Sequence, residues 1–228
     1  MKRFVSFGVL FFFNFSLCQI QLPVSDSVTN FLFTKSEKEK LSIITVNGVF
    51  ELNNNSWEYF KFPSSSFKQE IKKIGVEFSH KEYLSVSTSK DFYLVSVGGG
   101  PVFKKDDNQF IRIDNTSLHK NQVWGSFFVF NDKIHIYGGY GFWSFKNYIT
   151  FYDSNIKQWD IVYNDSPYIP KGRGKAISLI TSDDKLYVLG GTTISSQSAL
   201  YNTDNEDAFY FDLIKKEFID LGKISEPL

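Results

Sequence analysis

The sequence reads Asp132-Lys-Ile-His-Ile-Tyr-Gly-Gly139 at one place and Asp184-Lys-Leu-Tyr-Val-Leu-Gly-Gly191 at another, and this pair of matching segments is the strongest indication of the fold. Each segment begins with Asp-Lys, continues with four mostly apolar residues and ends in a glycine pair. A polar turn, Asn131-Asp132 or Ser182-Asp183, separates each segment from an earlier apolar run, which is the pattern of a β-hairpin. The two segments are therefore copies of one repeated unit.

Each copy continues with a third apolar run that ends in an aspartate. The run is Ile149-Thr-Phe-Tyr-Asp153 in one copy and Ala208-Phe-Tyr-Phe-Asp212 in the other. Six residues beyond the aspartate both copies carry an aromatic residue, Trp159 or Phe218. Because this spacing is kept while the loops before the third run differ in length, we predict a third and a fourth strand in each unit.

Two weaker copies precede these units. One runs from Phe92 to Gly100 and then through Phe110-Ile-Arg-Ile-Asp114, with no aromatic residue six positions beyond Asp114. The other keeps only the last two strands, Val49-Phe-Glu-Leu-Asn53 and a strand at Trp57. The repeat therefore weakens toward the N-terminus.

The composition favours strands over helices. Of 228 residues 18% are aromatic and only one is Met, and aromatic residues are enriched in strands. Past the N-terminal region the apolar residues come in short runs bounded by Gly, Asn, Asp, Ser or Lys, and only Phe67 to Lys73 fits a short helix. We predict an all-β protein.

The order of double glycine, Tyr-Asp or Phe-Asp, and a later aromatic resembles the kelch repeat, whose units are four-stranded antiparallel blades of a β-propeller. The resemblance implies blades near 76–118, 123–163 and 174–221 and a partial blade at 28–62, so that three to four blades are present. Its structural positions would be Gly98, Gly99, Gly138, Gly139, Asp153, Trp159, Gly190, Gly191, Asp212 and Phe218. Since such rings hold about 4 to 8 blades, we expect further sequence beyond Leu228.

The N-terminus has the features of a secretory signal peptide. Lys2 and Arg3 precede an uncharged run from Phe4 to Cys18, which is shorter than the roughly 20 residues that span a bilayer. We predict cleavage after Cys18, a secreted or periplasmic location for residues 19–228, and no membrane span in that segment. Cleavage would also remove the only cysteine.

Charge and motifs exclude several functions. The whole chain has 25 basic and 25 acidic residues, and loss of the signal leaves a net charge of −2, which argues against a nucleic-acid partner. No nucleophile elbow, phosphate loop or dinucleotide motif is present, and His80, His119 and His135 are far apart in sequence. We predict no enzyme activity, no cofactor and no metal. The copper oxidases that share the kelch fold need a cysteine crosslinked to a tyrosine, which the mature chain lacks.

The binding candidates lie in loops that a propeller would present on one face. Tyr140, Phe142, Trp143 and Phe145 follow the glycine pair, and Tyr168, Lys171 and Arg173 belong to the next connection between blades. Exposed aromatics of this kind stack on sugars or anchor in protein pockets. The alternative is that these rings fill the space between blades, and that Arg173 bonds loop carbonyls.

These features predict an exported, noncatalytic recognition module. A near-neutral chain suggests aromatic and hydrogen-bonding contacts, and we expect a protein partner, with a glycan as the alternative. Two further hypotheses stay open: the sensor ectodomain of a membrane-bound regulator, and the propeller domain of a secreted carbohydrate-active or oxidase enzyme.

The repeat alignment also predicts that Trp159 is buried. Substitution of Trp159 by Ala is therefore expected to cost about 3–5 kcal/mol of stability.

Overall fold

The computed structural model describes residues 22–23, 30–36, 40–195 and 201–224. The predicted signal peptide lies outside these residues. The chain forms four antiparallel sheets of four strands each, two small hairpins and one helix. The fold is all-β, as predicted.

The four sheets follow one another along the chain. The first holds β1 (Phe31–Lys35), β2 (Leu41–Thr45), β3 (Gly48–Asn53) and β4 (Ser56–Lys61), and the second holds β5 (Tyr83–Ser87), β6 (Phe92–Ser96), β7 (Val102–Asp106) and β8 (Gln109–Arg112). The third holds β9 (Ser126–Phe130), β10 (Lys133–Tyr137), β13 (Ile149–Asp153) and β14 (Gln158–Ile161). The fourth holds β15 (Ile177–Ile180), β16 (Lys185–Leu189), β19 (Asp207–Asp212) and β20 (Glu217–Lys223).

The remaining elements connect or flank the sheets. One hairpin, β11 (Tyr140–Gly141) with β12 (Ser144–Phe145), lies between the second and third strands of the third sheet. The other, β17 (Thr192–Ile194) with β18 (Asn202–Asp204), takes the same place in the fourth sheet. Helix α1 (Ser66–Ile74) contains the predicted helical segment and ends at Gly75, whose φ of 81° is left-handed. Within the described ranges no helix has the length and apolar character needed to cross a bilayer.

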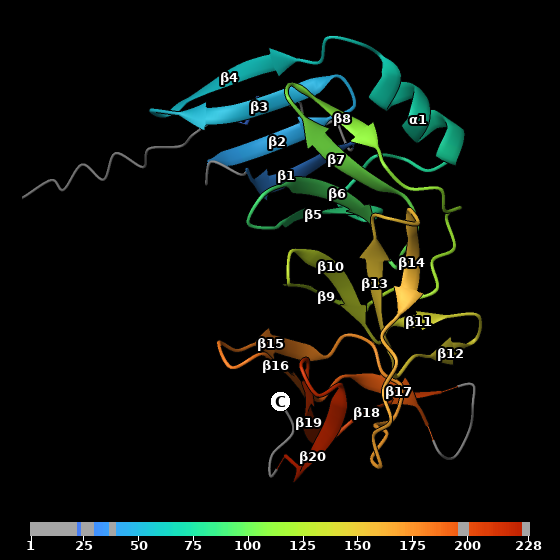
Figure 1. Ribbon diagram of the computed structural model, residues 1–228. Coiled ribbons are helices and arrows are strands. Elements are labelled where there is room, and N and C mark those ends of the chain that lie inside the picture. Colours follow the sequence, from blue (N-terminus) through green and yellow to red (C-terminus); the bar gives the residue numbers. More distant parts are fainter. Residues whose placement is uncertain (1–21, 24–29, 37–39, 196–200, 225–228) are drawn as a thin grey trace, which may run out of the picture.

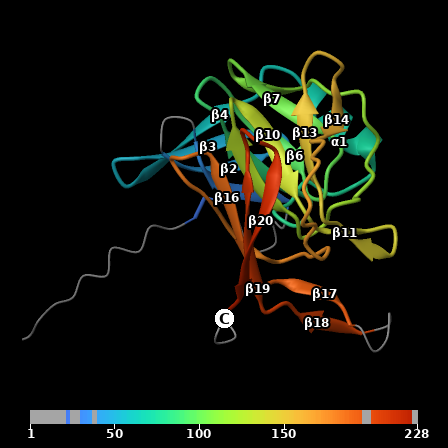
Figure 2. The ribbon, with the colours of Figure 1, turned by 60° about the horizontal axis from the view of Figure 1, so that its bottom comes forward.

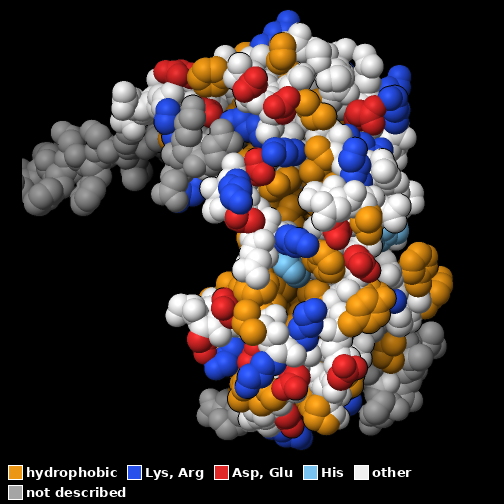
Figure 3. Space-filling view, viewed as in Figure 1, with side chains coloured by type: hydrophobic (Ala, Val, Ile, Leu, Met, Phe, Trp, Pro, Cys, Tyr) orange, Lys and Arg blue, Asp and Glu red, His pale blue; other side chains and the backbone are white. Residues whose placement is uncertain are grey.

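The sheets are arranged in an arc. The first strands of successive sheets contact each other, β1 with β5, β5 with β9 and β9 with β15, while the fourth strands lie far from this line of contacts (Figure 1). The space-filling view shows the arc as a body that is deeply hollowed on one side (Figure 3).

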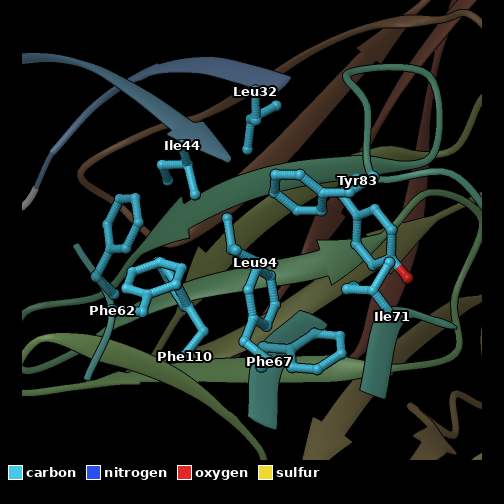
Figure 4. Packing of buried hydrophobic residues seen from close by; sticks show 11 residues of the cluster. Leu32, Ile44, Phe62, Phe67, Ile71, Tyr83, Leu94 and Phe110 are labelled. Carbon is cyan, nitrogen blue, oxygen red and sulfur yellow. The ribbon is translucent and has the colours of Figure 1, made fainter. Parts of the chain in front are cut away.

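Apolar side chains fill the space between neighbouring sheets. Between the first and second sheets, Leu32 and Ile44 face Tyr83 and Leu94, and α1 adds Phe67 to the same cluster (Figure 4). Two further clusters lie between the second and third sheets and between the third and fourth. Burial of both faces of the inner sheets holds the arc together.

The structure corrects the predicted alignment of the two N-terminal units. The first unit, predicted as partial at 28–62, is a complete four-stranded sheet. In the second unit the third strand is β7, which ends at Asp106, whereas the segment from Phe110 to Asp114 overlaps the fourth strand β8 and includes the two residues after it. The error arose because β7 and β8 are joined by a two-residue turn, whereas the two C-terminal units use four residues there.

The corrected alignment gives every fourth strand an aromatic second residue. These residues are Trp57, Phe110, Trp159 and Phe218, and each pairs across the sheet with a residue of the third strand. Gly98 and Gly99, in contrast, do not align with the later glycine pairs. In the second sheet Ser96 takes the place of Gly138. The amide N of each donates a hydrogen bond to the carbonyl O of the residue just before the third strand, which is Pro101 for Ser96 and Tyr148 for Gly138.

Candidate functional site

The glycine pair of the third sheet lets the β11–β12 hairpin fold back onto the neighbouring connections. Gly139 has a φ of 93°, and a Cβ there would lie 2.5 Å from the backbone of Gln122. Its amide N donates a hydrogen bond of 2.7 Å to the carbonyl O of Arg173. No residue with a side chain fits so close to both segments without moving them.

The turn of this hairpin has an unusual composition. Its two residues, Phe142 and Trp143, have φ values of 44° and 63°. The two-residue turn between β3 and β4 has nearly the same angles, 44° and 66°, but uses Asn54 and Asn55. Positive φ at both positions is typical of type I′ turns, which favour Asn, Asp and Gly, whereas bulky residues are strained there.

Both rings of this turn point into solvent. The side chain of Phe142 is 73% exposed and that of Trp143 is 88% exposed. The sequence left open that they fill the space between sheets, and their exposure argues against this. The chain therefore holds two large apolar rings in water in a strained conformation, and such strain is a mark of functional sites.

Three further aromatic residues lie at the base of the hairpin. The rings of Tyr140 and Phe145 are 4.9 Å apart, and Trp124 stacks on Tyr140 at 6.1 Å with an angle of 29° between the planes. Trp124 is exposed and has a φ of 65°. Among the described residues the aromatics with positive φ are Trp124, Phe142 and Trp143, and all three lie in this group. We call Trp124, Tyr140, Phe142, Trp143 and Phe145 the aromatic hairpin face.

Sequence reasoning missed Trp124. It lies in the connection between the second and third sheets, and the cross-strand pairing of Val123 with Tyr140 brings it to the hairpin. Its only sequence signal was a tryptophan in a loop, directly before Gly125.

Arg173 is fully buried, which contradicts its prediction as a ligand-binding residue. Its guanidinium donates to the Gly190 carbonyl O at 3.0 Å and to Asp207 Oδ2 at 2.9 Å, and its Nε donates to the Lys171 carbonyl O at 3.2 Å. It also lies 4.8 Å from the ring centre of Phe209. Arg173 therefore locks the connection between the third and fourth sheets, in agreement with the alternative that it bonds loop carbonyls.

Tyr168 and Lys171 lie beside the aromatic hairpin face rather than in it. Both line an open cleft of about 430 Å³ bounded by β18 and the end of β20. Burial is the main cause that raises the pKa of Tyr168, and its ring packs 6.4 Å from that of Phe209. The cleft adjoins the hairpin at Gly172, where a Cβ would lie 2.2 Å from the Phe145 carbonyl O.

The histidines do not form a common site. His135 is buried on β10, where its ring stacks on Phe128 at 5.0 Å and its Nδ1 bonds the Lys133 carbonyl O at 2.9 Å. Burial lowers the pKa of His135 to about 4. Across the described ranges no three His, Cys, Asp or Glu side chains gather as they would around a metal ion.

The two loop hairpins lie on the same side of the molecule. Figures 1 and 2 show β11 on the same side as β17 and β18, and β12 contacts β17. The Gly172 carbonyl O, which accepts a hydrogen bond of 2.6 Å from Thr193 Oγ1, joins the two hairpins through the connection between them.

Comparison with known proteins bears on the fold alone. No family model matches the chain, and no curated protein matches it. Among solved structures it is similar to one titled "Structure of YjhT", with a TM-score of 0.54 and 14% sequence identity. The similarity covers 86% of this chain and 67% of that chain, so the succession of four-stranded sheets is an arrangement that a solved structure also contains.

Proposed function

We propose that this chain is an exported, noncatalytic recognition module that binds a protein partner through the aromatic hairpin face. The observation that carries the proposal is the turn of Phe142 and Trp143, where two exposed rings occupy positions that Asn54 and Asn55 fill elsewhere. Because these two rings are exposed, they contribute nothing to the core, and their backbone is strained as well. Aromatic anchors of this kind supply much of the binding energy in protein interfaces.

We further propose that the four sheets are kelch-like blades of a β-propeller. The contacts between successive first strands support this, because first strands of propeller blades line a common axis. The aromatic second residue of each fourth strand also supports it. Trp159 Nε1 donates a hydrogen bond of 2.8 Å to the Gly100 carbonyl O of the preceding sheet.

The two end sheets carry features that fit a ring with more blades than these four. The outward face of the fourth sheet leaves Ile177 and Leu179 exposed, and the first sheet leaves Phe33 and Tyr59 exposed. Trp57 holds the place of Trp159 in the first sheet, and its buried Nε1 has no hydrogen-bond partner among the described residues. A preceding blade would supply an acceptor to Trp57 as Gly100 does to Trp159.

The binding proposal is tested by installing a photo-crosslinking residue at position 143 in the exported protein. Partners captured in the extracellular or envelope fraction are identified, purified and titrated against wild type, Trp143→Ala and Tyr163→Ala. Tyr163 is also an exposed aromatic residue, at 76%, but it lies outside the aromatic hairpin face, so Tyr163→Ala serves as the matched control. We expect only Trp143→Ala to lose binding. Equal affinity of all three proteins, or Trp143-dependent binding on a glycan array alone, would contradict the proposal.

A further inference from the structure

Three lysines stand around the aromatic hairpin face. Lys175 Nζ lies 4.4 Å from the ring centre of Trp124, and its amide N donates to the Trp124 carbonyl O at 2.8 Å. Lys146 follows β12 directly, and its Nζ donates to Ser144 Oγ at 2.7 Å. Lys171 is exposed next to Gly172, which presses against Phe145.

None of these lysines has a carboxylate within 4 Å among the described residues. Some lysines elsewhere do form ion pairs, such as Lys120 with Glu82 at 2.8 Å and Lys104 with Asp91 at 2.7 Å, whereas others, such as Lys68, form none among the described residues. What distinguishes Lys146 and Lys175 is that, within the same ranges, they are unpaired and lie beside the exposed rings. Burial lowers the pKa of Lys146, as expected for an ammonium group without a counterion.

The local charge therefore differs from that of the whole chain. The whole chain has 25 basic and 25 acidic residues, and this near-neutral charge suggested that charge would not drive binding, but the fold brings to one face three lysines that form no ion pair within the described part of the chain. Lys171 also borders the cleft that contains Asp204 and Asp220, so we base the inference on Lys146 and Lys175.

We infer that the partner presents an acidic protein segment in which Asp or Glu side chains flank an aromatic or aliphatic anchor. This inference rests on the proposed function. The carboxylates would pair with Lys146 and Lys175, and the anchor would pack on the rings of Phe142 and Trp143. Complementary charge speeds association and fixes register, while the aromatic anchor supplies most of the affinity.

The arrangement favours a protein segment over a lipid surface. Lys175 lies on the Trp124 ring, so that charge and apolar surface alternate within one face. A peptide with alternating acidic and apolar side chains matches this pattern. A bilayer instead places its charges in one layer and its apolar region beneath them.

The probes are two sets of 12-residue peptides, in which Glu and Asp alternate with Trp, Phe or Leu, and the same peptides with Gln and Asn in place of the acids. Fluorescence anisotropy is measured at 50 and 300 mM NaCl with wild type, Trp143→Ala, the double variant Lys146→Gln with Lys175→Gln, and Lys68→Gln. Lys68 is an exposed lysine on α1 and is the matched control. Circular dichroism melts establish that each variant is folded.

We expect the acidic peptides to bind wild type, and to bind it at least fivefold more weakly at 300 mM than at 50 mM NaCl. Their affinity for the double lysine variant should be at least tenfold lower than for wild type, whereas their affinity for Lys68→Gln should be unchanged. Equal binding of acidic and amide peptides, with Trp143→Ala still defective, overturns the acidic segment but keeps the proposed function. Unchanged binding by Trp143→Ala overturns the proposed function. Trp143-dependent binding only to vesicles with 30% phosphatidylserine overturns the inference in favour of a lipid surface.

Discussion

Replacing Phe142 by Asn and Trp143 by Gly is expected to stabilise the protein while it removes the binding face. The two residues form a turn with positive φ at both positions, and Asn-Gly is the sequence that such turns favour. The rings are 73% and 88% exposed, so their removal gives up little buried apolar area.

The size of the effect follows from the backbone. A left-handed conformation costs an ordinary residue about 1–2 kcal/mol, which gives about 2–4 kcal/mol for the two positions together. The greater freedom that a glycine at the second position has in the unfolded chain offsets up to about 1 kcal/mol. We therefore expect a gain of about 1–3 kcal/mol, and for a chain of this length each kcal/mol raises Tm by about 2–4 °C.

The measurement is a urea titration with a thermal melt, and the reciprocal variant is the control. Asn54→Phe with Asn55→Trp puts the same two side chains into a turn of the same φ values, and it should lower stability by a similar amount. A double variant at 142 and 143 that is less stable than wild type by more than about 1 kcal/mol would show that the rings stabilise the fold. The strain reasoning, and with it the main support for the binding face, would then be wrong.

Three further changes test the packing and the electrostatics. Trp159→Phe should cost about 1–2 kcal/mol in urea titrations, because it keeps most of the ring but leaves the Gly100 carbonyl O without its donor; a neutral effect would contradict this bond. Arg173→Ala should cost about 3 kcal/mol because it leaves Asp207 without its partner, whereas the exposed Lys171→Ala should change stability by less than about 0.5 kcal/mol. Burial lowers the pKa of His135 from 6.5 to about 4, so between these pH values the unfolded chain binds a proton that the folded chain does not. The free energy of unfolding should therefore be unaffected by His135 above pH 6.5 and should fall by up to about 3 kcal/mol as the pH drops toward 4. His135→Leu should remove that part of the pH dependence, and an unchanged slope would refute the assignment.

Many strands of this protein could be predicted from sequence because they are short apolar runs that end at a turn with its own residue signature. Strands β1 and β7 were missed, and β7 has the charged residues Lys104, Lys105 and Asp106 in its second half. The alignment of the units was harder, because it depends on turn length. Two residues join β7 to β8 where four residues join β13 to β14, so counting six from an aspartate missed Phe110. Phe110 is buried at the position that Trp159 holds in the next sheet.

The candidate site was predicted in part. The rings between Tyr140 and Phe145 could be identified because they follow a glycine pair in a loop. Trp124 could not, because it reaches the hairpin only through the pairing of Val123 with Tyr140, a contact between distant segments. Arg173 was misplaced because a charged residue in a loop is usually exposed, and only the fold brings it to Asp207 and the Gly190 carbonyl.

The place of the aromatic hairpin in the sheet explains how the fold can carry a binding loop without losing its packing. In the second, third and fourth sheets a backbone hydrogen bond closes the chain where the second strand gives way to the third, from Ser96 N to Pro101 O, from Gly138 N to Tyr148 O and from Gly190 N to Asp207 O. The segments enclosed by these bonds have 4, 9 and 16 residues. Each bond holds the end of the second strand to the start of the third. The loop between them can therefore lengthen, form its own hairpin or expose aromatic rings while the two strands keep their register. Recognition is therefore expected to vary at this position among proteins of similar fold, and the strain at Phe142 and Trp143 is confined to the turn of a hairpin that lies outside the four-stranded sheets.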